Sequence, residues 1–268
     1  MSAAVGFSAA AHFDLTGKVA VITGGTRGLG REMAGAFAAA GADVVVASRK
    51  ADACEAAAAE ISAETGRRAI GVPCHVGRWA DLERLEAAVF EAFEHVDILV
   101  NNAGMAPLYP SLVEVSEDLF DKVIAVNLKG PFRLSALFGT RMAAGRGGTI
   151  INISSVAAQR PQVGDLPYAA AKAGLNTLTA GFANAYGPTV RVNGVMVGPF
   201  LTDISKAWDV AGFQQFAKER YALGRLGVPN EIVGTALYLA SDLSSFMTGT
   251  TLTVDGGVSI SSPFPPSS

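Results

Sequence analysis

The stretch Lys18-Val-Ala-Val-Ile-Thr-Gly-Gly-Thr-Arg-Gly-Leu-Gly30 decides the fold of this chain. Its first six residues are mostly apolar and β-branched, as is typical of a buried parallel strand. A glycine-rich turn follows, and residues 31–40 are strong helix formers that Gly41 is placed to end. Residues 42–48, Ala-Asp-Val-Val-Val-Ala-Ser, predict the next strand. This strand–turn–helix–strand unit has about the length that a right-handed crossover needs.

The same alternation continues along the chain. Ser116 is the expected N-cap of a helix that Gly130-Pro131 interrupts. Strands that alternate with helices predict an α/β fold, a Rossmann-like doubly wound parallel β-sheet of about seven strands with helices on both faces. We expect a single domain at residues 13–260, between a flexible N-terminal tail (1–12) and a C-terminal tail (261–268). The further strands are expected within residues 68–76, 97–101, 149–154, 190–195 and 250–255, and the further helices at 51–65, 79–94, 116–129, 131–144, 168–186 and 230–241.

Composition limits the class of protein. Half of the 268 residues are apolar, so a sizeable core can form, and the net charge is −3 without a dense Lys/Arg run. A nucleic-acid partner is therefore not expected. No stretch approaches 18 continuous apolar residues, and the N-terminus lacks the positive start of a signal peptide, so neither a membrane span nor secretion is expected. Two cysteines make no disulfide framework and three histidines show no metal-ligand spacing, which indicates a cytoplasmic protein without a metal site.

The glycine turn lies between a strand and a helix, which is the context that a dinucleotide-binding motif requires. Gly24 can make the tight turn, Gly28 lets a pyrophosphate approach the backbone, and Gly30 lets the helix pack close to the sheet. The helix N-terminus then offers free N–H groups to the phosphates. The spacing Gly-x-x-x-Gly-x-Gly differs from the best-known fingerprint, so an ordinary glycine-rich turn is the alternative.

The end of the second strand bears on the choice between NAD and NADP. An acidic residue there would bind the 2′-hydroxyl of NAD, but the chain reads Ser48-Arg49-Lys50. Arg49, helped by the Ser48 hydroxyl, suits a 2′-phosphate, and Arg27 in the glycine turn adds a second cation. NADP(H) is therefore favoured over NAD(H). The alternative is that Arg49 and Lys50 are solvated surface charges.

A tyrosine and a lysine, Tyr168 and Lys172, are four residues apart on a predicted helix and share one face. A nearby cation favours the phenolate and lowers the pKa of a phenol, which allows Tyr168 to act as a base near neutral pH. The pair alone is weak support, because a half-buried ring beside a solvated charge is common.

Taken together, these motifs resemble the short-chain dehydrogenases/reductases, over about residues 15–258. The resemblance rests on Thr23-Gly24-x-x-x-Gly28-x-Gly30, on Asn101-Asn102-Ala103-Gly104, on Asn127, on Ser155 thirteen residues before Tyr168, and on Tyr168-x-x-x-Lys172. Each motif alone is modest, but the whole set in this order and spacing is specific.

The resemblance implies a catalytic role for four residues. Tyr168 would exchange a proton with the substrate oxygen while hydride moves to or from the nicotinamide. Lys172 would lower the pKa of Tyr168 and bind the nicotinamide ribose. Ser155, rather than its neighbour Ser154, would orient the substrate oxygen. Asn127 would hold a water molecule next to Lys172.

The resemblance also implies a set of cofactor contacts. Two positions depart from the family pattern: His75 stands where an aspartate near the adenine is frequent, and could stack on the base, hydrogen-bond it or simply be exposed. Val197 stands where the family usually has proline. The residues expected to contact the cofactor are Gly24, Thr26, Arg27, Gly28, Leu29, Gly30, Ser48, Arg49, His75, Val76, Asn102, Ala103, Gly104, Tyr168, Lys172, Gly198, Phe200 and Thr202.

Three loops should converge on the substrate: residues 105–110, 156–167 and a lid at about 200–223. The aromatic residues of the lid hint at an apolar pocket, or only pack the lid onto the body: Trp208, Phe213, Phe216 and Tyr221. The chain is thus predicted to be an NADP(H)-dependent oxidoreductase that interconverts a ketone and a secondary alcohol. An NAD-dependent alcohol dehydrogenase and a non-catalytic dinucleotide sensor are the alternatives. The substrate stays open, and a homotetramer is implied by the resemblance alone.

Overall fold

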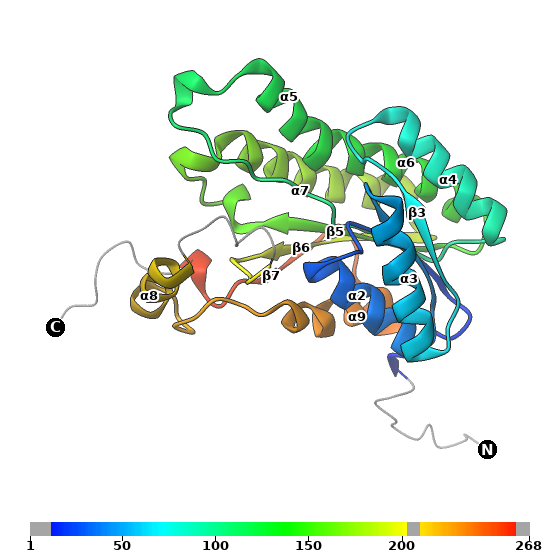
Figure 1. Ribbon diagram of the computed structural model, residues 1–268. Coiled ribbons are helices and arrows are strands. Elements are labelled where there is room, and N and C mark those ends of the chain that lie inside the picture. Colours follow the sequence, from blue (N-terminus) through cyan, green and yellow to red (C-terminus); the bar gives the residue numbers. More distant parts are fainter. Residues whose placement is uncertain (1–11, 203–209, 261–268) are drawn as a thin grey trace.

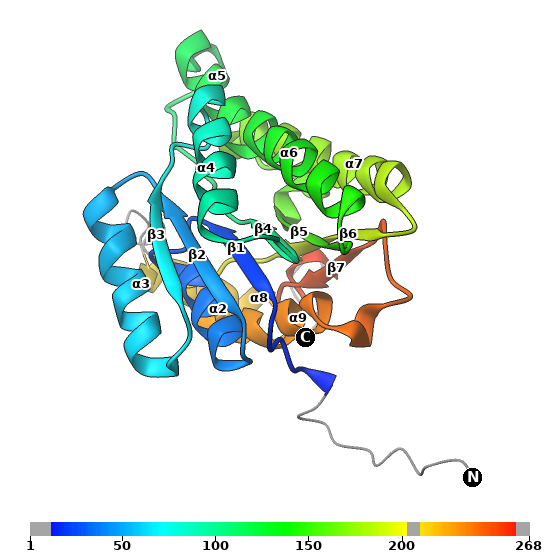
Figure 2. The same cartoon turned by 90° about the vertical axis from the view of Figure 1, so that its right-hand side faces the viewer.

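The protein is built on a parallel sheet whose strand order is β3-β2-β1-β4-β5-β6-β7 (Figures 1 and 2). The computed structural model describes residues 12–202 and 210–260, and within them the sheet has seven strands, all paired in parallel. The order reverses between β1 and β4, so this is the switch point at which open α/β sheets bind ligands. The predicted doubly wound sheet is confirmed. The strands are β1 (Val19–Thr23), β2 (Asp43–Ser48), β3 (Ala69–Pro73), β4 (Ile98–Asn101), β5 (Gly148–Ser155), β6 (Val190–Val197) and β7 (Thr251–Val254).

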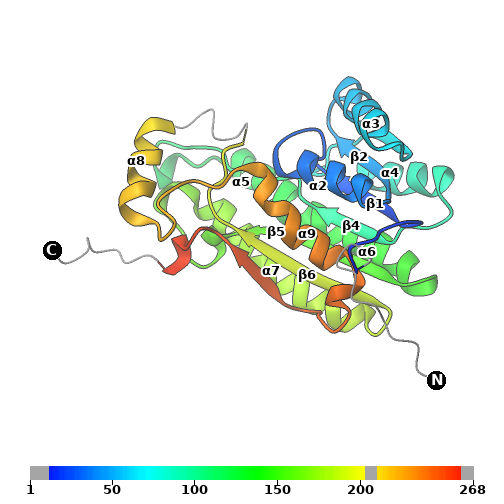
Figure 3. The ribbon, with the colours of Figure 1, turned by 90° about the horizontal axis from the view of Figure 1, so that it is seen from below.

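Helices cover both faces of the sheet. Three of them, α2 (Gly28–Ala39), α3 (Ala51–Thr65) and α9 (Val233–Ala240), enclose one hydrophobic core, and Figure 3 shows α2 and α9 lying across that face. The other core lies under α4 (Trp79–Ala92), α6 (Gly130–Ala144) and α7 (Leu166–Tyr186). Every residue of β1 is buried, because a strand covered on both faces has no solvent side.

The helix after β4 differs from the prediction. Ser116 is its N-cap, as predicted, and accepts a hydrogen bond from the Leu119 N–H at 3.2 Å. The predicted interruption at Gly130-Pro131 is wrong, because α5 (Glu117–Ile124) passes through a π-helical turn (Ala125–Lys129) directly into α6. Pro131 has no N–H for the carbonyl four residues back, and the wider turn before it accommodates that loss. Asn127 lies in this turn.

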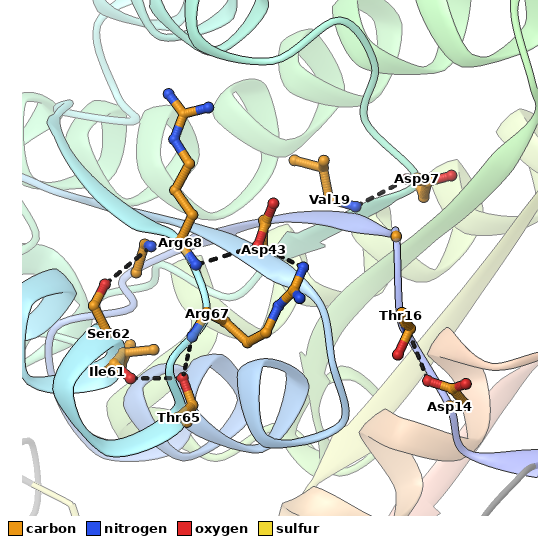
Figure 4. Close-up of polar contacts among 12 residues, drawn as sticks. Asp14, Thr16, Val19, Asp43, Ile61, Ser62, Thr65, Arg67, Arg68 and Asp97 are labelled. Atoms are coloured by element: carbon orange, nitrogen blue, oxygen red, sulfur yellow. Dashed lines mark hydrogen bonds and ion pairs between the residues drawn. The ribbon is translucent and has the colours of Figure 1, made fainter.

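The amino ends of the strands carry structural carboxylates, away from the switch point (Figure 4). Asp97 is 5% exposed and accepts a hydrogen bond from the Val19 N–H at 2.9 Å. Asp43 accepts from the Arg67 guanidinium at 2.8 Å and from the Arg68 N–H at 3.2 Å (Figure 4). These bonds hold the loops before β1, β3 and β4 against the sheet. The carboxylates at this edge therefore stabilise the fold.

Part of the predicted periphery lies outside the described residues. This holds for residues 1–11 and 261–268 of the two predicted tails, and for residues 203–209 of the predicted lid, Trp208 included. The rest of the lid contains α8 (Val210–Arg220). None of the helices in the described ranges is long and apolar enough to cross a membrane.

Candidate active site

The turn between β1 and α2 has the shape of a phosphate cradle. Gly24 and Gly28 have φ angles of +67° and +53°, a region that side chains disfavour. A Cβ on Gly30 would overlap the carbonyl oxygen of Gly24, so only glycine allows α2 to pack this closely. The side chain of Arg27, the N-cap residue, makes no capping hydrogen bond to α2. The free N–H groups and partial positive charge of this helix N-terminus therefore suit a pyrophosphate, and the residues present fit a dinucleotide.

The end of β4 holds this turn in place. The Asn102 amide donates to the carbonyl oxygens of Thr23 (2.8 Å) and Gly24 (3.3 Å). In return, the Thr23 hydroxyl accepts from the N–H groups of Asn102 (3.0 Å) and Ala103 (3.1 Å). Asn102 is thus primarily a support of the glycine turn. Thr23 was not predicted to have this role, although a threonine directly before a glycine turn is a usable signal.

The fold brings together the two backbone segments that carry the residues predicted to bind the 2′-phosphate. The Thr26 hydroxyl donates to the Ser48 hydroxyl at 3.3 Å, which joins the glycine turn to the end of β2. Arg27 and Arg49 each follow one member of this bonded pair, and both are exposed. The fold therefore brings two cations to the same edge of the sheet, as a 2′-phosphate site requires.

Strand β5 and helix α7 bring together three of the four predicted catalytic residues. Ser155 ends β5, and its hydroxyl lies close enough to Tyr168, near the start of α7, to lower the pKa of that phenol. One turn later, the Lys172 ammonium lies 5.6 Å from the centroid of the Tyr168 ring and donates to the Ile153 carbonyl at 2.8 Å. The rival Ser154 instead donates to the Lys172 carbonyl at 3.4 Å. The geometry therefore favours Ser155.

The pKa of Tyr168 differs from the prediction. Burial raises the pKa of this phenol, Asp165 raises it further, and the hydrogen bond with Ser155 only partly opposes them. Burial also lowers the pKa of Lys172 to about 8. The predicted lowering of the Tyr168 pKa is thus absent from the protein alone. The free energy lost when a phenolate is removed from water is larger than the stabilisation that the neighbouring groups give it. Tyr168 is consequently a protonated phenol at neutral pH in the protein alone.

Asn127 lies on the Lys172 side of this group. Its amide N–H groups donate to the carbonyls of Met105 (2.8 Å) and Val123 (2.9 Å), and its oxygen accepts from the Met105 N–H at 3.2 Å. A Cβ on Gly104 would lie 3.0 Å from this oxygen and 3.7 Å from the Lys172 ammonium. Both amide hydrogens of Asn127 are already donated to carbonyl oxygens. The predicted water molecule would therefore have to donate its hydrogen bond to an oxygen of Asn127.

Two of the predicted substrate loops meet beside Tyr168. The Tyr109 hydroxyl donates to the Val163 carbonyl at 2.6 Å and accepts from the Leu166 N–H at 3.0 Å. A small cavity is lined here by Tyr109, Asp165 and Tyr168. Tyr109 was not predicted as a site residue. Its hydroxyl joins two loops, and its partners are more than fifty residues away in the sequence, so only the structure reveals this role.

The loop after β6 returns to the glycine turn. Val197 still belongs to β6 and pairs with Ser155 and Val254, so a valine at this position extends the strand. Phe200 is buried and forms a β-bridge with Gly227. Thr202 comes next to Gly28, on which a Cβ would lie 3.4 Å from the Thr202 side chain. Of the predicted residues of this loop, Thr202 thus lies at the cradle, whereas Gly198 packs against Asp255 and Phe200 against Gly227.

The buried ammonium of Lys172 is expected to make the stability of the protein depend on pH. Because the pKa is lowered from 10.5 to about 8, the unfolded chain binds more protons than the folded chain between these values, and the contribution of Lys172 to stability rises with pH across this window. Relative to Lys172→Met, the wild-type free energy of unfolding should increase by up to about 3 kcal/mol from pH 8 to pH 10.5. Urea denaturation of both proteins at each pH measures this difference, and parallel profiles would contradict the lowered pKa.

Comparison with known proteins agrees with this geometry. A family model described as Enoyl-(Acyl carrier protein) reductase matches residues 24–259. The short chain dehydrogenase/reductase astE of Aspergillus oryzae is 39% identical over 92% of this chain and 97% of its own length. A gluconate 5-dehydrogenase from Burkholderia cenocepacia, solved with NADP and tartrate, has a TM-score of 0.89 at 33% identity and covers 94% of this chain and 99% of its own. An L-sorbose reductase from Gluconobacter frateurii, solved with NADPH and L-sorbose, has a TM-score of 0.86 at 28% identity, over 92% and 98%.

The family model spans most of the chain, and the relatives carry the names of dehydrogenases and reductases. They match over nearly their whole length, and the residues that carry the resemblance gather at the switch point of one sheet. The chain therefore belongs to the short-chain dehydrogenase/reductase family and is an oxidoreductase that acts on alcohols or ketones with NAD(P).

Proposed function

We propose that this protein is an NADP(H)-dependent oxidoreductase that interconverts a ketone and a secondary alcohol. The observation that carries the proposal is the grouping of three side chains: Ser155 lies close enough to lower the pKa of Tyr168, and the Lys172 ammonium lies 5.6 Å from the centroid of the Tyr168 ring. A proton donor, its orienting partner and a buried cation are what hydride transfer to a carbonyl needs beside a nicotinamide.

In the reducing direction, Tyr168 donates its phenolic proton to the oxygen of the substrate carbonyl. The Ser155 hydroxyl binds the same oxygen and stabilises the charge that develops on it. Lys172 offsets the negative charge left on Tyr168, and a proton reaches the pair past Asn127. The bound nicotinamide supplies or accepts the hydride. In the oxidising direction the same residues act in reverse, and Tyr168 takes the alcohol proton.

The raised pKa of Tyr168 keeps the phenol protonated at neutral pH in the protein alone, which is the form that the reducing direction needs. A phenol that holds its proton is a better acid than base at neutral pH. Oxidation requires the phenolate, which a positively charged nicotinamide next to Lys172 would stabilise. The direction of the reaction is thus proposed to depend on which form of the cofactor is bound.

The preference for NADP(H) is proposed from the edge formed by Thr26, Arg27, Ser48 and Arg49. The bond between Thr26 and Ser48 supports it, and the second strand ends without a carboxylate. Two structurally similar relatives were solved with NADP or NADPH. Paired fluorescence titrations with NADPH and NADH test this preference, and tighter NADH binding would favour an NAD-dependent alcohol dehydrogenase. If both cofactors bind and no alcohol or ketone turns over, the dinucleotide-sensing alternative gains support.

A substitution of Arg49 tests the 2′-phosphate site directly. Arg49→Ala should weaken NADPH binding by about ten- to a hundredfold, because a charge-assisted hydrogen bond contributes roughly 1.5–3 kcal/mol, and should leave NADH binding unchanged. Lys50→Ala removes the adjacent exposed cation and is the matched control. An equal loss for NADPH and NADH in Arg49→Ala would show that this arginine does not bind the 2′-phosphate.

The substrate, the lid and the assembly are proposed more broadly. The rings of Phe213, Phe216 and Tyr221 contact one another at the described end of the proposed lid, with centroids 5.9–6.3 Å apart. Since the two similar structures carry the names of gluconate and sorbose enzymes, a screen with sugar acids and polyols beside apolar ketones is the first choice. A homotetramer is proposed from the family resemblance and a cytoplasmic location from the two free cysteines, and sedimentation of the purified protein tests the former.

A further inference from the structure

His75 lies where the base of a bound dinucleotide would end. Pro73 of β3 pairs with Ser48 of β2, and the Cys74 N–H donates to the Ser48 carbonyl at 2.7 Å. His75 therefore leaves the sheet at the same edge as Ser48 and Arg49. A pyrophosphate held by α2 and a ribose held at the end of β2 would direct the base toward the end of β3, where His75 lies.

Three hydrogen bonds fix the position of His75. Its N–H donates to the Asp81 carboxylate at 3.0 Å, and its carbonyl accepts from the Arg78 N–H at 2.8 Å. Its imidazole Nδ1 lies 3.2 Å from the Gly77 nitrogen and accepts that N–H. The ring is half-buried. The residue is thus held by α4 and by its own turn, and it is not a freely rotating surface side chain.

The bond from Gly77 also determines what the ring can offer. A neutral imidazole carries one N–H, and an Nδ1 that accepts leaves that hydrogen on Nε2. Among the residues that the structure describes, Nε2 has no protein acceptor. A donor at this edge of the sheet is therefore available to a ligand.

We propose that His75 recognises the cofactor base as a hydrogen-bond donor, through Nε2–H to the purine N7. This inference rests on the proposed dinucleotide site. It adds which hydrogen-bonding groups of the cofactor base the site recognises. Adenine offers an acceptor at N7 and a donor at its 6-amino group, whereas a 6-oxo purine offers acceptors at both N7 and O6. A donor finds a partner on either base, but a carboxylate needs the 6-amino group. The site should therefore tolerate a hypoxanthine dinucleotide.

The experiment compares two reduced cofactors, NADPH and its hypoxanthine analogue, by fluorescence titration of the protein without substrate. The wild-type dissociation constants should differ by less than about fivefold. His75→Asn and His75→Asp form a matched pair of equal size. Asparagine can accept from the Gly77 N–H and still donate, so its ratio should stay near that of the wild type. Aspartate can only accept, so its ratio should shift against the hypoxanthine cofactor by at least about tenfold.

The outcomes separate this inference from the proposed function. A wild-type preference for NADPH above about fivefold, or the same ratio in His75→Asp as in the wild type, would overturn the donor role while NADPH still binds. Failure of NADPH and NADH to bind the wild type at all would instead overturn the dinucleotide site. If His75→Asp does not fold, as judged by circular dichroism, the ratios of dissociation constants for the wild type and His75→Asn test the donor role. A ratio above about fivefold in either protein would then overturn it.

Discussion

Replacing Tyr168 with phenylalanine is expected to lower kcat by roughly 10²–10⁴-fold, the usual contribution of a positioned acid or base, and to leave the Kd for NADPH nearly unchanged. The phenol is the group that Ser155 holds next to the substrate position, and the exchange removes only its oxygen. The ring stays in place over Lys172, so the cofactor side of the pocket keeps its shape. Steady-state kinetics and a fluorescence titration of the same preparation measure the two effects.

A second tyrosine on the same helix is the control. Tyr186 ends α7, and its hydroxyl donates to the Ala136 carbonyl at 3.2 Å, away from the site. Tyr186→Phe should keep kcat within about twofold, because it removes only the hydrogen bonds with the Ala136 carbonyl and the Thr140 hydroxyl, each worth roughly 1 kcal/mol of stability. If Tyr168→Phe retained more than a tenth of the wild-type turnover, another group would have to be the acid.

Gly30→Ala is expected to destabilise the fold by about 1–3 kcal/mol, the usual cost of overpacking, and to weaken NADPH binding sharply. The new methyl group would overlap the Gly24 carbonyl and would lie 2.5 Å from the Asn102 amide. The backbone cannot yield at that point, because Asn102 and Thr23 hold the turn with several hydrogen bonds. Moving the turn displaces the N–H groups that the pyrophosphate needs.

Gly35→Ala, on the same helix, is the matched control for this substitution. A Cβ there would approach only the end of the flexible Arg31 side chain, at 3.0 Å. Alanine should then stabilise α2 by up to about 1 kcal/mol through its higher helix propensity. Thermal unfolding and NADPH titration of both variants measure the contrast. Equal stability of the two proteins would show that the close contact at Gly30 is not a constraint on the fold.

Local patterns predicted most elements well. The helix at residues 51–65 has the bounds that its composition predicts, because a run of alanines between two turns is helical wherever it packs. Strand β6 is longer than predicted and runs to Val197, since pairing with β5 and β7 extends it. The break at Gly130-Pro131 was wrong for a related reason. Close packing of α6 against the Val76 carbonyl, which only glycine permits, keeps the backbone helical.

The amino-acid sequence by itself determined the order of strands and helices, the glycine turn and the spacing of Ser155, Tyr168 and Lys172. These properties depend on residue type and periodicity over short distances, which the chain carries wherever it folds. The tertiary structure alone decided that Tyr109 joins two loops and that the pKa of Tyr168 is raised. Each of these depends on burial or on partners far away in the sequence, because desolvation and hydrogen bonding exist only after the sheet has brought its loops to one edge.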